Sequence, residues 1–287
     1  MRIGLLYQPR IEASAQHARR VHERLASDGH DAWVGSSWDI GDDPEPIRDS
    51  DLLFTFGGDG TLLRAARAAA VYGVPCTGVN YGRIGFLTEI RAADFDERLP
   101  EFLNSDHWVE ERVLIDWTRS SSAGWVSGGL AAGDVVAGRG RMARVVEIEV
   151  LVDGALLTTY MADGVIVATP TGTTGYTQAA HGPVLHPESR ELAVTPIAPF
   201  LTPSNAMVLR AGAVIELVVH TTHEATLSID GQTEQLLDSG DRITCRISEH
   251  LARFARVQPR GYFYATLAEK LHWRVPREMP RPAAGPS

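Results

Sequence analysis

A glycine-rich turn at residues 57–61, Gly-Gly-Asp-Gly-Thr, has the residue types that phosphate chemistry requires. It follows the apolar run 51–56 and precedes an alanine- and leucine-rich segment that is typical of a helix. The N-terminus of a helix has unpaired backbone amides and a partial positive charge, and it therefore attracts anions. Glycines let a phosphate oxygen approach the backbone closely. The turn therefore predicts a phosphate-binding site between a buried strand and a helix.

Asp59 lies in the middle of this turn. A carboxylate among phosphate-binding amides is poorly suited to binding alone, but it can deprotonate a hydroxyl group or help to hold a divalent metal. Phosphoryl transfer requires both positioning and charge neutralisation. In the alternative interpretation the segment is a tight strand-to-helix turn, and Asp59 only caps the helix. The turn lacks the lysine of a Walker A loop and the spacing of the dinucleotide fingerprint.

A second polar segment, residues 169–178, contains five threonines, two glycines and a tyrosine. Hydroxyl groups and glycine amides suit the recognition of ribose and phosphate, although a polar surface loop is the alternative. Asn80 follows a strand-like run, and it could bind a nucleotide or stabilise its own turn. His181 and His186 flank a glycine-proline pair, but no third ligand lies at a spacing that suits zinc. We therefore expect these histidines to form hydrogen bonds in a loop, and we predict no metal site on the protein.

The composition indicates a globular protein with two modest domains or one large one. The chain has 287 residues, of which 44% are hydrophobic and 22% are charged. Its formal net charge of −9 argues against a nucleic-acid partner and, more weakly, against a membrane surface. The apolar runs are shorter than the about 20 residues of a membrane span, and the N-terminus does not resemble a secretory signal. Cys76 and Cys245 are too few for a disulfide framework, so we expect two buried thiols in a cytoplasmic protein.

Strand and helix signals alternate over residues 1–105, which predicts a Rossmann-like α/β domain with a parallel sheet covered on both faces. Asp94 and Glu97 have the spacing of a capping box that opens the last of these helices. The predicted strands are 3–7, 31–34, 51–56 and 74–79, and the predicted helices are 14–26, 61–71 and 94–104.

Strand signals dominate residues 106–257 and predict a β-sandwich as the second domain. Residues 145–152 are rich in β-branched side chains, and Asp153-Gly154 offers a hairpin turn after them. Residues 258–274 are expected to return as a helix that packs on the first domain. The proline-rich residues 275–287 are expected to form a disordered tail. Further short strands are predicted at 156–160, 214–219, 226–229 and 242–247.

The pentapeptide at 57–61 matches a motif shared by NAD kinases, diacylglycerol and sphingosine kinases and, in a near form, phosphofructokinases. Later segments distinguish among these families, because their order and spacing resemble the motifs of NAD kinases up to about residue 273. The segment 78–89 resembles the family's Gly-x-Asn-x-Gly-x-Leu-Gly-Phe-Leu stretch, and 162–176 resembles a strand followed by Thr-Pro-Thr-Gly-Ser-Thr-Ala-Tyr. The other matching segments are 181–183, 195–199 and 229–232.

The resemblance implies an NAD kinase, which transfers the γ-phosphate of ATP to the 2′-hydroxyl group of the adenosine ribose of NAD and makes NADP. Polyphosphate replaces ATP in some members of the family. Magnesium, or another divalent metal, would be bound mainly through the ATP phosphates. The family also implies a homodimer or homotetramer, in which loops of a neighbouring chain can complete the site.

The same resemblance gives Asp59 the role of the general base that takes the proton of the 2′-hydroxyl group. Arg64 would contact phosphate or nucleotide as a charged donor, and Tyr176 could stack on a base. The full set of nucleotide-binding residues that it implies is Gly58, Gly60, Arg64, Asn80, Gly133, Asp134, Arg144, Met161, Asp163, Thr174, Gly175, Tyr176, Thr177, Gln178, Ala179 and Gln232.

Four of these positions depart from the family's pattern. Gly133 stands where the family has asparagine, and Met161 where some members have arginine. Gly175 replaces a usual alanine, and Ala179 a usual serine. Two alternatives stay open. One is a lipid kinase, because it shares the glycine turn, and the other, indicated by Gly133 and Met161, is a family member that binds the dinucleotide without turnover. The threonine-rich segment and the acidic charge argue against the first alternative, and the intact Asp59 argues against the second.

Overall fold

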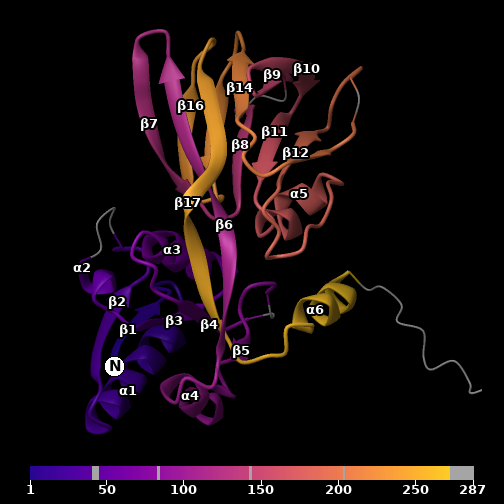
Figure 1. Ribbon diagram of the computed structural model, residues 1–287. Helices are drawn as coiled ribbons and strands as arrows, with labels where there is room; N and C mark the ends of the chain where they lie inside the picture. Colours follow the sequence, from indigo (N-terminus) through magenta and orange to yellow (C-terminus); the bar gives the residue numbers. More distant parts are fainter. Residues whose placement is uncertain (41–44, 83–84, 142–143, 203, 272–287) are drawn as a thin grey trace, which may run out of the picture. The chain divides into compact units, whose positions relative to one another are not determined.

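The computed structural model describes residues 1–40, 45–82, 85–141, 144–202 and 204–271. The chain divides into two compact units, Met1–Val257 and Gln258–Ser287, whose helices and strands are drawn in Figure 1. In the second unit the predicted helix is present as α6 (Tyr262–Lys270). The predicted tail lies outside the described residues, and the packing of the second unit on the first domain stays a prediction.

Four parallel strands form the predicted α/β layer, in the order β4-β3-β1-β2. Val21 and Leu25 of α1 belong to the buried cluster on one face of the sheet, together with Ile3 and Phe54. The buried leucine and alanine side chains of α3 belong to the cluster on the other face. Each fully buried valine, leucine, isoleucine or phenylalanine side chain stabilises the fold by roughly 1.5–3 kcal/mol. The elements are β1 (Arg2–Tyr7), α1 (Glu12–Ser27), β2 (Asp31–Ser36), β3 (Leu52–Gly57), α3 (Asp59–Ala70) and β4 (Cys76–Asn80).

One prediction for the last helix of this domain is wrong. Helix α4 (Phe95–Leu103) is present, and Asp94 is its N-cap residue. The Asp94 side chain makes no cap hydrogen bond, because its backbone is helical (φ −95°, ψ −4°) rather than extended as a capping residue requires. The capping-box prediction is therefore wrong. Two short elements were not predicted, α2 (Glu45–Arg48) and β5 (Ile90–Arg91).

The predicted sandwich has one wholly antiparallel sheet in the order β13-β12-β11-β8-β15-β16. Its apolar face packs against β9, β14 and the first half of β17 in a single buried cluster that includes Val165, Leu227 and Ile215. The strands of this half are β6 (Trp108–Ser121), β7 (Gly124–Ala131), β8 (Asp134–Arg139), β9 (Val146–Val152), β10 (Ala155–Ala162), β11 (Gly164–Ala168), β12 (Leu192–Ile197), β13 (Met207–Leu209), β14 (Ile215–His220), β15 (Ala225–Ile229), β16 (Thr233–Leu237) and β17 (Arg242–Arg256). The predicted hairpin turn is confirmed, with Asp153 and Gly154 both at positive φ between β9 and β10.

Strand β17 joins the two halves of the first unit. Its beginning pairs antiparallel with β14, where Cys245 faces Ile215, and its end pairs parallel with β4, where Phe254 faces Cys76. The second sheet of the sandwich and the parallel strands therefore form one continuous sheet of 11 strands, while the antiparallel sheet of six strands stays separate. The sequence predicted only the first six residues of β17, and the domain boundaries at residues 105 and 257 stay a prediction.

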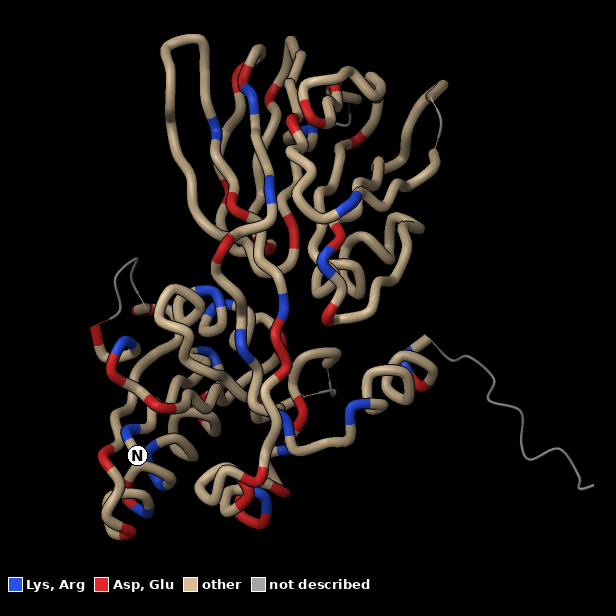
Figure 2. Tube along the Cα trace, viewed as in Figure 1, with Lys and Arg blue, Asp and Glu red and all other residues tan. Residues whose placement is uncertain are grey.

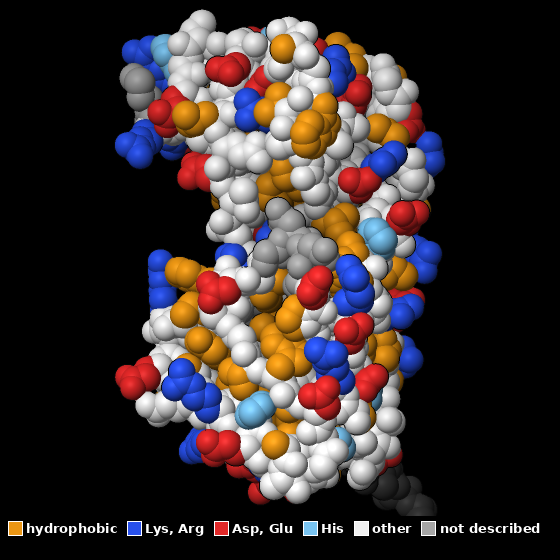
Figure 3. All heavy atoms as spheres, turned by 90° about the vertical axis from the view of Figure 1, so that its left-hand side faces the viewer, with side chains coloured by type: hydrophobic (Ala, Val, Ile, Leu, Met, Phe, Trp, Pro, Cys, Tyr) orange, Lys and Arg blue, Asp and Glu red, His pale blue; other side chains and the backbone are white. Residues whose placement is uncertain are grey.

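The surface carries mixed charge. Acidic and basic positions are both scattered along the trace in Figure 2, and in the view of Figure 3 basic side chains are interspersed with acidic ones. None of the described helices combines the length and apolar character that crossing a membrane requires. Cys76 and Cys245 are both buried and free, as predicted.

Candidate active site

The glycine turn lies where β3 ends and α3 begins. Gly58 is the N-cap residue of α3, and Asp59 is its first helical residue. A Cβ atom on Gly57 would lie 2.3 Å from Oγ1 of Thr61, so the tight turn requires glycine there. Gly58 and Gly60 border open space, because a Cβ atom on either would meet no atom within 4 Å. The turn thus presents helix-terminal backbone to a space that a phosphate could enter.

The Asp59 carboxylate is held by a different loop. Phe86 N donates to Oδ2 at 2.7 Å. Oδ1 accepts from Leu87 N at 3.3 Å, from Thr88 N at 3.0 Å and from Thr88 Oγ1 at 3.0 Å. The interpretation of Asp59 as only a helix cap is therefore wrong, because Gly58 occupies that position. The carboxylate instead ties α3 to the loop that follows β4.

Asn80 belongs to the same loop. Its Nδ2 donates to Thr88 Oγ1 at 2.7 Å, and its Oδ1 accepts from Gly82 N at 2.5 Å. Thr88 therefore connects the Asn80 amide to the Asp59 carboxylate. The turn-stabilising interpretation of Asn80 is confirmed, while its contact with a nucleotide stays a prediction.

Asp230, which the sequence analysis missed as a site residue, organises the turn that contains Gly133 and Asp134. Its carboxylate accepts from Ala132 N at 3.0 Å, from Gly133 N at 2.7 Å and from Asp134 N at 3.2 Å. The side chain is fully buried and pairs with Arg67 of α3 at 3.2 Å. The residue also has a positive φ of 53°, which non-glycine residues adopt rarely. The available signal was the Asp-Gly pair inside the last family-like segment.

Asp134 lies close to this second carboxylate. Burial, together with the negative charge of Asp230, raises the pKa of Asp134 to about 7. At neutral pH the Asp134 carboxyl group is therefore divided between its neutral and ionised forms. The neutral form can donate one hydrogen bond, whereas the ionised form only accepts.

The threonine-rich segment packs against the same turn. Thr169 Oγ1 donates to Ala132 O at 2.7 Å, and Thr169 N donates to Gly133 O at 2.9 Å. A Cβ atom on Gly172 would lie 2.1 Å from Gly133 O, so this approach requires glycine. Gly133 and Asp134 are therefore brought beside the threonine-rich segment, as the prediction of a common site requires.

The segment continues into two short helices that were not predicted, η1 (Gly172–Thr174) and α5 (Tyr176–Ala179). Thr174 Oγ1 donates to Thr171 O at 3.1 Å, and Gly175 links the two helices as the N-cap of α5. Thr177 is fully buried, and its hydroxyl has no partner among the described residues. Gln178 is partly buried, whereas Tyr176 and Ala179 are exposed.

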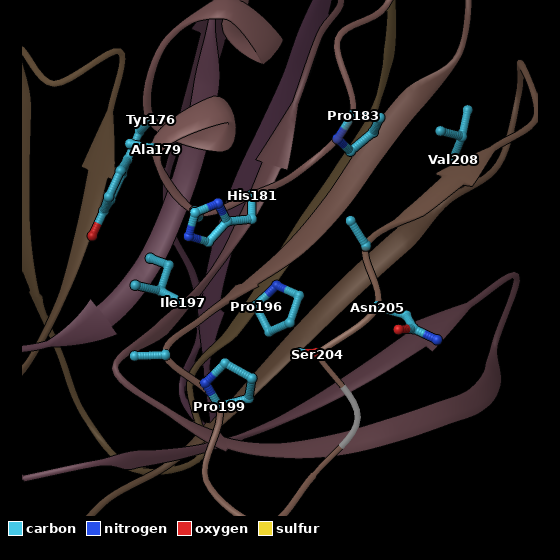
Figure 4. Close-up of a pocket in the computed structure, with 13 residues that line it drawn as sticks. Tyr176, Ala179, His181, Pro183, Pro196, Ile197, Pro199, Ser204, Asn205 and Val208 are labelled. Atoms are coloured by element: carbon cyan, nitrogen blue, oxygen red, sulfur yellow. The ribbon is translucent and has the colours of Figure 1, made fainter.

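Tyr176 and Ala179 line a cavity of about 960 Å³. Figure 4 shows His181, Pro196 and Ile197 around the same space, contributed by the segment after α5 and by β12. The lining is mostly apolar, and it brings together two of the predicted dinucleotide contacts. His181 has the loop position that we expected. Among the described residues, no group of three His, Cys, Asp or Glu side chains could hold a metal ion.

Three predicted contacts lie elsewhere on the sandwich. Arg144 and Met161 line a separate cavity of about 750 Å³, and Arg144 Nη1 lies 2.8 Å from His223 Nε2. Asp163 forms an ion pair with Arg139, whose Nε lies 2.8 Å from its Oδ1. Asp163 precedes β11, while Thr169 follows the other end of that strand, so about 20 Å of extended chain separates these two residues. Arg144 and Met161 therefore line a different cavity from Tyr176 and Ala179. Asp163 N, in contrast, donates to the backbone oxygen of Ile197, which lines the cavity of Tyr176.

The remaining predicted contacts surround the glycine turn. Gly58, Gly60, Arg64 and Gln232 line one cavity of about 650 Å³. Gln232 Nε2 also donates to Gly60 O at 2.9 Å, which fixes the sandwich loop against the turn. The structure therefore places these four predicted residues in one location.

A buried ion cluster beneath the site was not predicted. Arg112 Nη2 donates to both carboxylate oxygens of Glu110 at 3.0 and 3.1 Å, and Arg256 Nε donates to Glu110 at 2.8 Å. Burial acts to raise the pKa of Glu110, but the two arginines hold it below its usual range. Arg112 also donates to Thr171 at 3.3 Å, and Arg256 pairs with Glu89 at 3.5 Å. The cluster therefore connects the loop that holds Asp59 with the threonine-rich segment.

The geometry defines a class of protein. A phosphate-binding turn lies at the carboxyl end of a parallel sheet, a carboxylate lies within that turn, and polar loops of a β-sandwich adjoin it. This combination is that of a nucleotide-dependent phosphotransferase.

Comparison with known proteins identifies the family. The model of the ATP-NAD kinase N-terminal domain matches residues 5–107, and that of the ATP-NAD kinase C-terminal domain matches residues 133–257. The NAD kinase of Dehalococcoides mccartyi is 39% identical over 272 residues, which cover 94% of this chain and 95% of that protein. The chain belongs to the ATP-NAD kinase family, and the resemblance inferred from the motifs is confirmed.

Solved structures agree with this assignment. An NAD kinase from Archaeoglobus fulgidus in complex with ATP is similar with a TM-score of 0.77 at 27% identity, covering 95% of this chain and 99% of that one. Yeast NADH kinase complexed with NADH has a TM-score of 0.80 at 21% identity, with coverage of 97% and 89%. The second comparison shows a common fold. The predicted arrangement of an α/β domain followed by a β-sandwich is therefore confirmed.

Proposed function

We propose that this chain transfers the γ-phosphate of ATP to the 2′-hydroxyl group of the adenosine ribose of NAD and releases NADP and ADP. The observation that carries the proposal is the position of the Asp59 carboxylate within the glycine turn, next to open space at Gly58 and Gly60. Membership of the ATP-NAD kinase family supports the choice of substrates.

The hydrogen-bond pattern of the Asp59 carboxylate suits a general base. A carboxylate oxygen has two lone pairs. Oδ1 accepts three hydrogen bonds, whereas Oδ2 accepts a single one, from Phe86 N, among the described residues. Oδ2 therefore retains a lone pair for the proton of a substrate hydroxyl group. We assign the base to this atom.

The reaction then follows from the positions of the groups. The proton of the 2′-hydroxyl passes to Asp59 Oδ2 while the ribose oxygen forms a bond to the γ-phosphorus. The bond between the γ-phosphorus and the bridging oxygen breaks, and ADP leaves. The amides at the start of α3 bind the developing negative charge, which is how positioning and electrostatics lower the barrier of phosphoryl transfer.

Magnesium fits this site as a companion of ATP. The described carboxylates form no metal cage, and the free lone pair of Asp59 Oδ2 is assigned to the substrate proton. Such an arrangement suits an ion held mainly by phosphate oxygens and water. When bound, the ion would neutralise phosphate charge.

The acceptor would lie on the sandwich side of the turn. Asp134 would bind the adenine or ribose, and Thr174 to Ala179 would contact the dinucleotide, with Tyr176 available for stacking. Arg144 and Met161 would reach this acceptor from a neighbouring chain, because they line a separate cavity within one chain. Asp163, whose backbone adjoins Ile197 of the Tyr176 cavity, would accept hydrogen bonds from the ribose. We therefore also propose a homodimer or homotetramer, located in the cytoplasm, with residues 1–105 and 106–257 as its domains.

Two alternatives are separated by one experiment. A lipid kinase finds no support, since both matching family models are those of ATP-NAD kinase. A dinucleotide-binding protein without turnover would bind NAD but form no product.

Purified protein with magnesium, ATP and NAD is expected to produce NADP, detected with a strictly NADP-dependent dehydrogenase. Parallel reactions contain NADH, or polyphosphate in place of ATP. NAD binding without NADP from either donor would contradict the proposal.

A further inference from the structure

The cavity at the glycine turn lies at a topological switch point of the parallel sheet. The chain runs from β1 to β2 on one side and then crosses to β3 on the other side of β1. The lining comes from the segments after β1, β2 and β3, with Gln8, Ser37 and Gly58 as one residue from each. Ligands of open α/β sheets bind at the carboxyl ends of the strands beside such a point. The volume of the cavity, about 650 Å³, lies within the range of small-molecule sites.

The cavity has the charge of an anion site. Arg10 and Arg64 line it, and the start of α3 contributes its partial positive charge. None of the described residues that line it carries a carboxylate. A chain of phosphates is therefore the complementary ligand for this part of the cavity.

Two polar side chains of the lining lack partners. Ser37 is fully buried, and its Oγ forms no hydrogen bond with the described residues. The Oε1 atom of Gln232 is also buried without a partner, while its Nε2 is engaged by Gly60 O. Buried polar groups are normally hydrogen-bonded, so a donor and an acceptor left open at one cavity indicate a polar ligand.

An aromatic residue completes the lining. Trp38 is 42% exposed, and the guanidinium carbon of Arg10 lies 4.4 Å from its ring centroid. Indole rings and guanidinium groups are the side-chain surfaces on which nucleic-acid bases stack. Inorganic phosphate chains have no ring that could stack on such a surface.

We propose that Trp38 and Arg10 bind the base of the phosphate donor, which makes the donor a nucleoside triphosphate rather than inorganic polyphosphate. The inference rests on the proposed function, and it assigns the donor to this cavity. The base stacks on the Trp38–Arg10 pair, and the phosphates extend past Arg64 to the start of α3. Ser37 Oγ and Gln232 Oε1 supply hydrogen bonds to the polar edges of the nucleoside.

The test compares donors and tryptophan variants of the full chain. Trp38→Ala is expected to raise the KM for ATP and the Kd for magnesium-ATP by roughly 5- to 100-fold, the range that loss of one stacking platform implies. The KM for NAD, and any residual rate with inorganic tripolyphosphate, are expected to stay unchanged. Trp38→Phe keeps a ring and is expected to stay within about threefold of the wild type. Trp125→Ala is the matched control, since Trp125 is 72% exposed on β7 and does not line this cavity.

The possible results distinguish the assignment of the cavity from the proposed function. If the wild type makes NADP and Trp38→Ala binds magnesium-ATP as well as Trp125→Ala does, the assignment of the cavity is wrong while the proposed function stands. Efficient use of tripolyphosphate by the wild type would also overturn it. If ATP binding depends on Trp38 but no NADP forms, the cavity assignment stands and the proposed function fails.

Discussion

Gly85 and Asp59 fit together so closely that a Cβ atom on Gly85 would lie 1.8 Å from Oδ1 of the Asp59 carboxylate. The backbone of residues 85–88 folds around the carboxylate and donates three amides to it. The direction in which the proposed base points is therefore set by a loop that lies more than 20 residues along the chain. Gly85 is required there because of space, since its φ is not positive.

We predict that Gly85→Ala lowers kcat by at least about tenfold and destabilises the fold by roughly 1–3 kcal/mol. The added methyl group would displace the carboxylate and break some of its charge-assisted hydrogen bonds. Gly82→Ala is the matched control, because a Cβ atom there would meet nothing nearer than 3.9 Å. Steady-state kinetics and urea denaturation of both variants measure the effect. Equal kcat values for the two variants would show that the loop does not position Asp59.

Asp59→Asn is predicted to lower kcat by roughly 10²- to 10⁴-fold, the contribution of a positioned base. The amide cannot take up a proton, and its Nδ2 cannot accept from the loop amides. NAD binding is expected to survive, because the acceptor residues belong to other loops. Asp94→Asn, at an exposed carboxylate, should behave as the wild type. Turnover by Asp59→Asn close to that of Asp94→Asn would remove Asp59 from the role of base.

The α/β half and the glycine turn were predictable because their signals are local. The continuous apolar run of β3, the apolar stripe of α1 and the glycines of the turn are all patterns within a few residues. The motif carries its own physics, since glycines before a helix imply accessible amides whatever the rest of the chain does. The same locality explains the hairpin at Asp153-Gly154.

The parts of the site that were not predicted from the sequence depend on contacts between residues that are distant along the chain. Asp230 acts on Ala132, which lies 98 residues away, and nothing near Asp230 in the sequence indicates that partner. Glu110 and Arg256 are 146 residues apart and meet because β6 and β17 pair along their whole lengths. The capping box failed for the opposite reason, because a correct local pattern was overridden by the backbone that Asp94 adopts in the folded chain.

The raised pKa of Asp134, about 7, predicts how stability depends on pH. In the unfolded chain an aspartate loses its proton near pH 4, whereas folded Asp134 retains it up to neutral pH. Between about pH 4 and about pH 7 the folded state therefore binds one proton more than the unfolded state. The contribution of Asp134 to the free energy of unfolding falls as the pH rises through this range. Asp134→Asn imitates the protonated form and should remove this fall.

Urea denaturation between pH 4 and pH 8 tests that prediction. The free energy of unfolding of Asp134→Asn is expected to increase relative to that of the wild type as the pH rises. The difference between the two is expected to be largest above pH 7. Asp106→Asn, at an exposed site, is the control and should follow the wild-type curve. A constant difference between wild type and Asp134→Asn at every pH would contradict the raised pKa.

The Arg67–Asp230 pair is predicted to couple α3 to the turn that carries Asp134. Asp230 is fully buried and Arg67 is 23% exposed, so water screens their attraction less than at the surface. In a double-mutant cycle with Arg67→Met and Asp230→Asn, we expect a coupling of roughly 1–3 kcal/mol in unfolding free energy. Asp230→Asn alone should also raise the KM for NAD, because one amide oxygen cannot hold three backbone amides.

The surface pair Arg253–Glu111, whose side chains are 44% and 41% exposed, provides the comparison. Its cycle, with Arg253→Met and Glu111→Gln, is expected to give about 0.2–1 kcal/mol and no change in the KM for NAD. The KM readout is what distinguishes a positioning role from simple stabilisation. If Asp230→Asn lowers stability but leaves the KM for NAD equal to that of the Glu111→Gln variant, Asp230 supports the fold without positioning the acceptor turn.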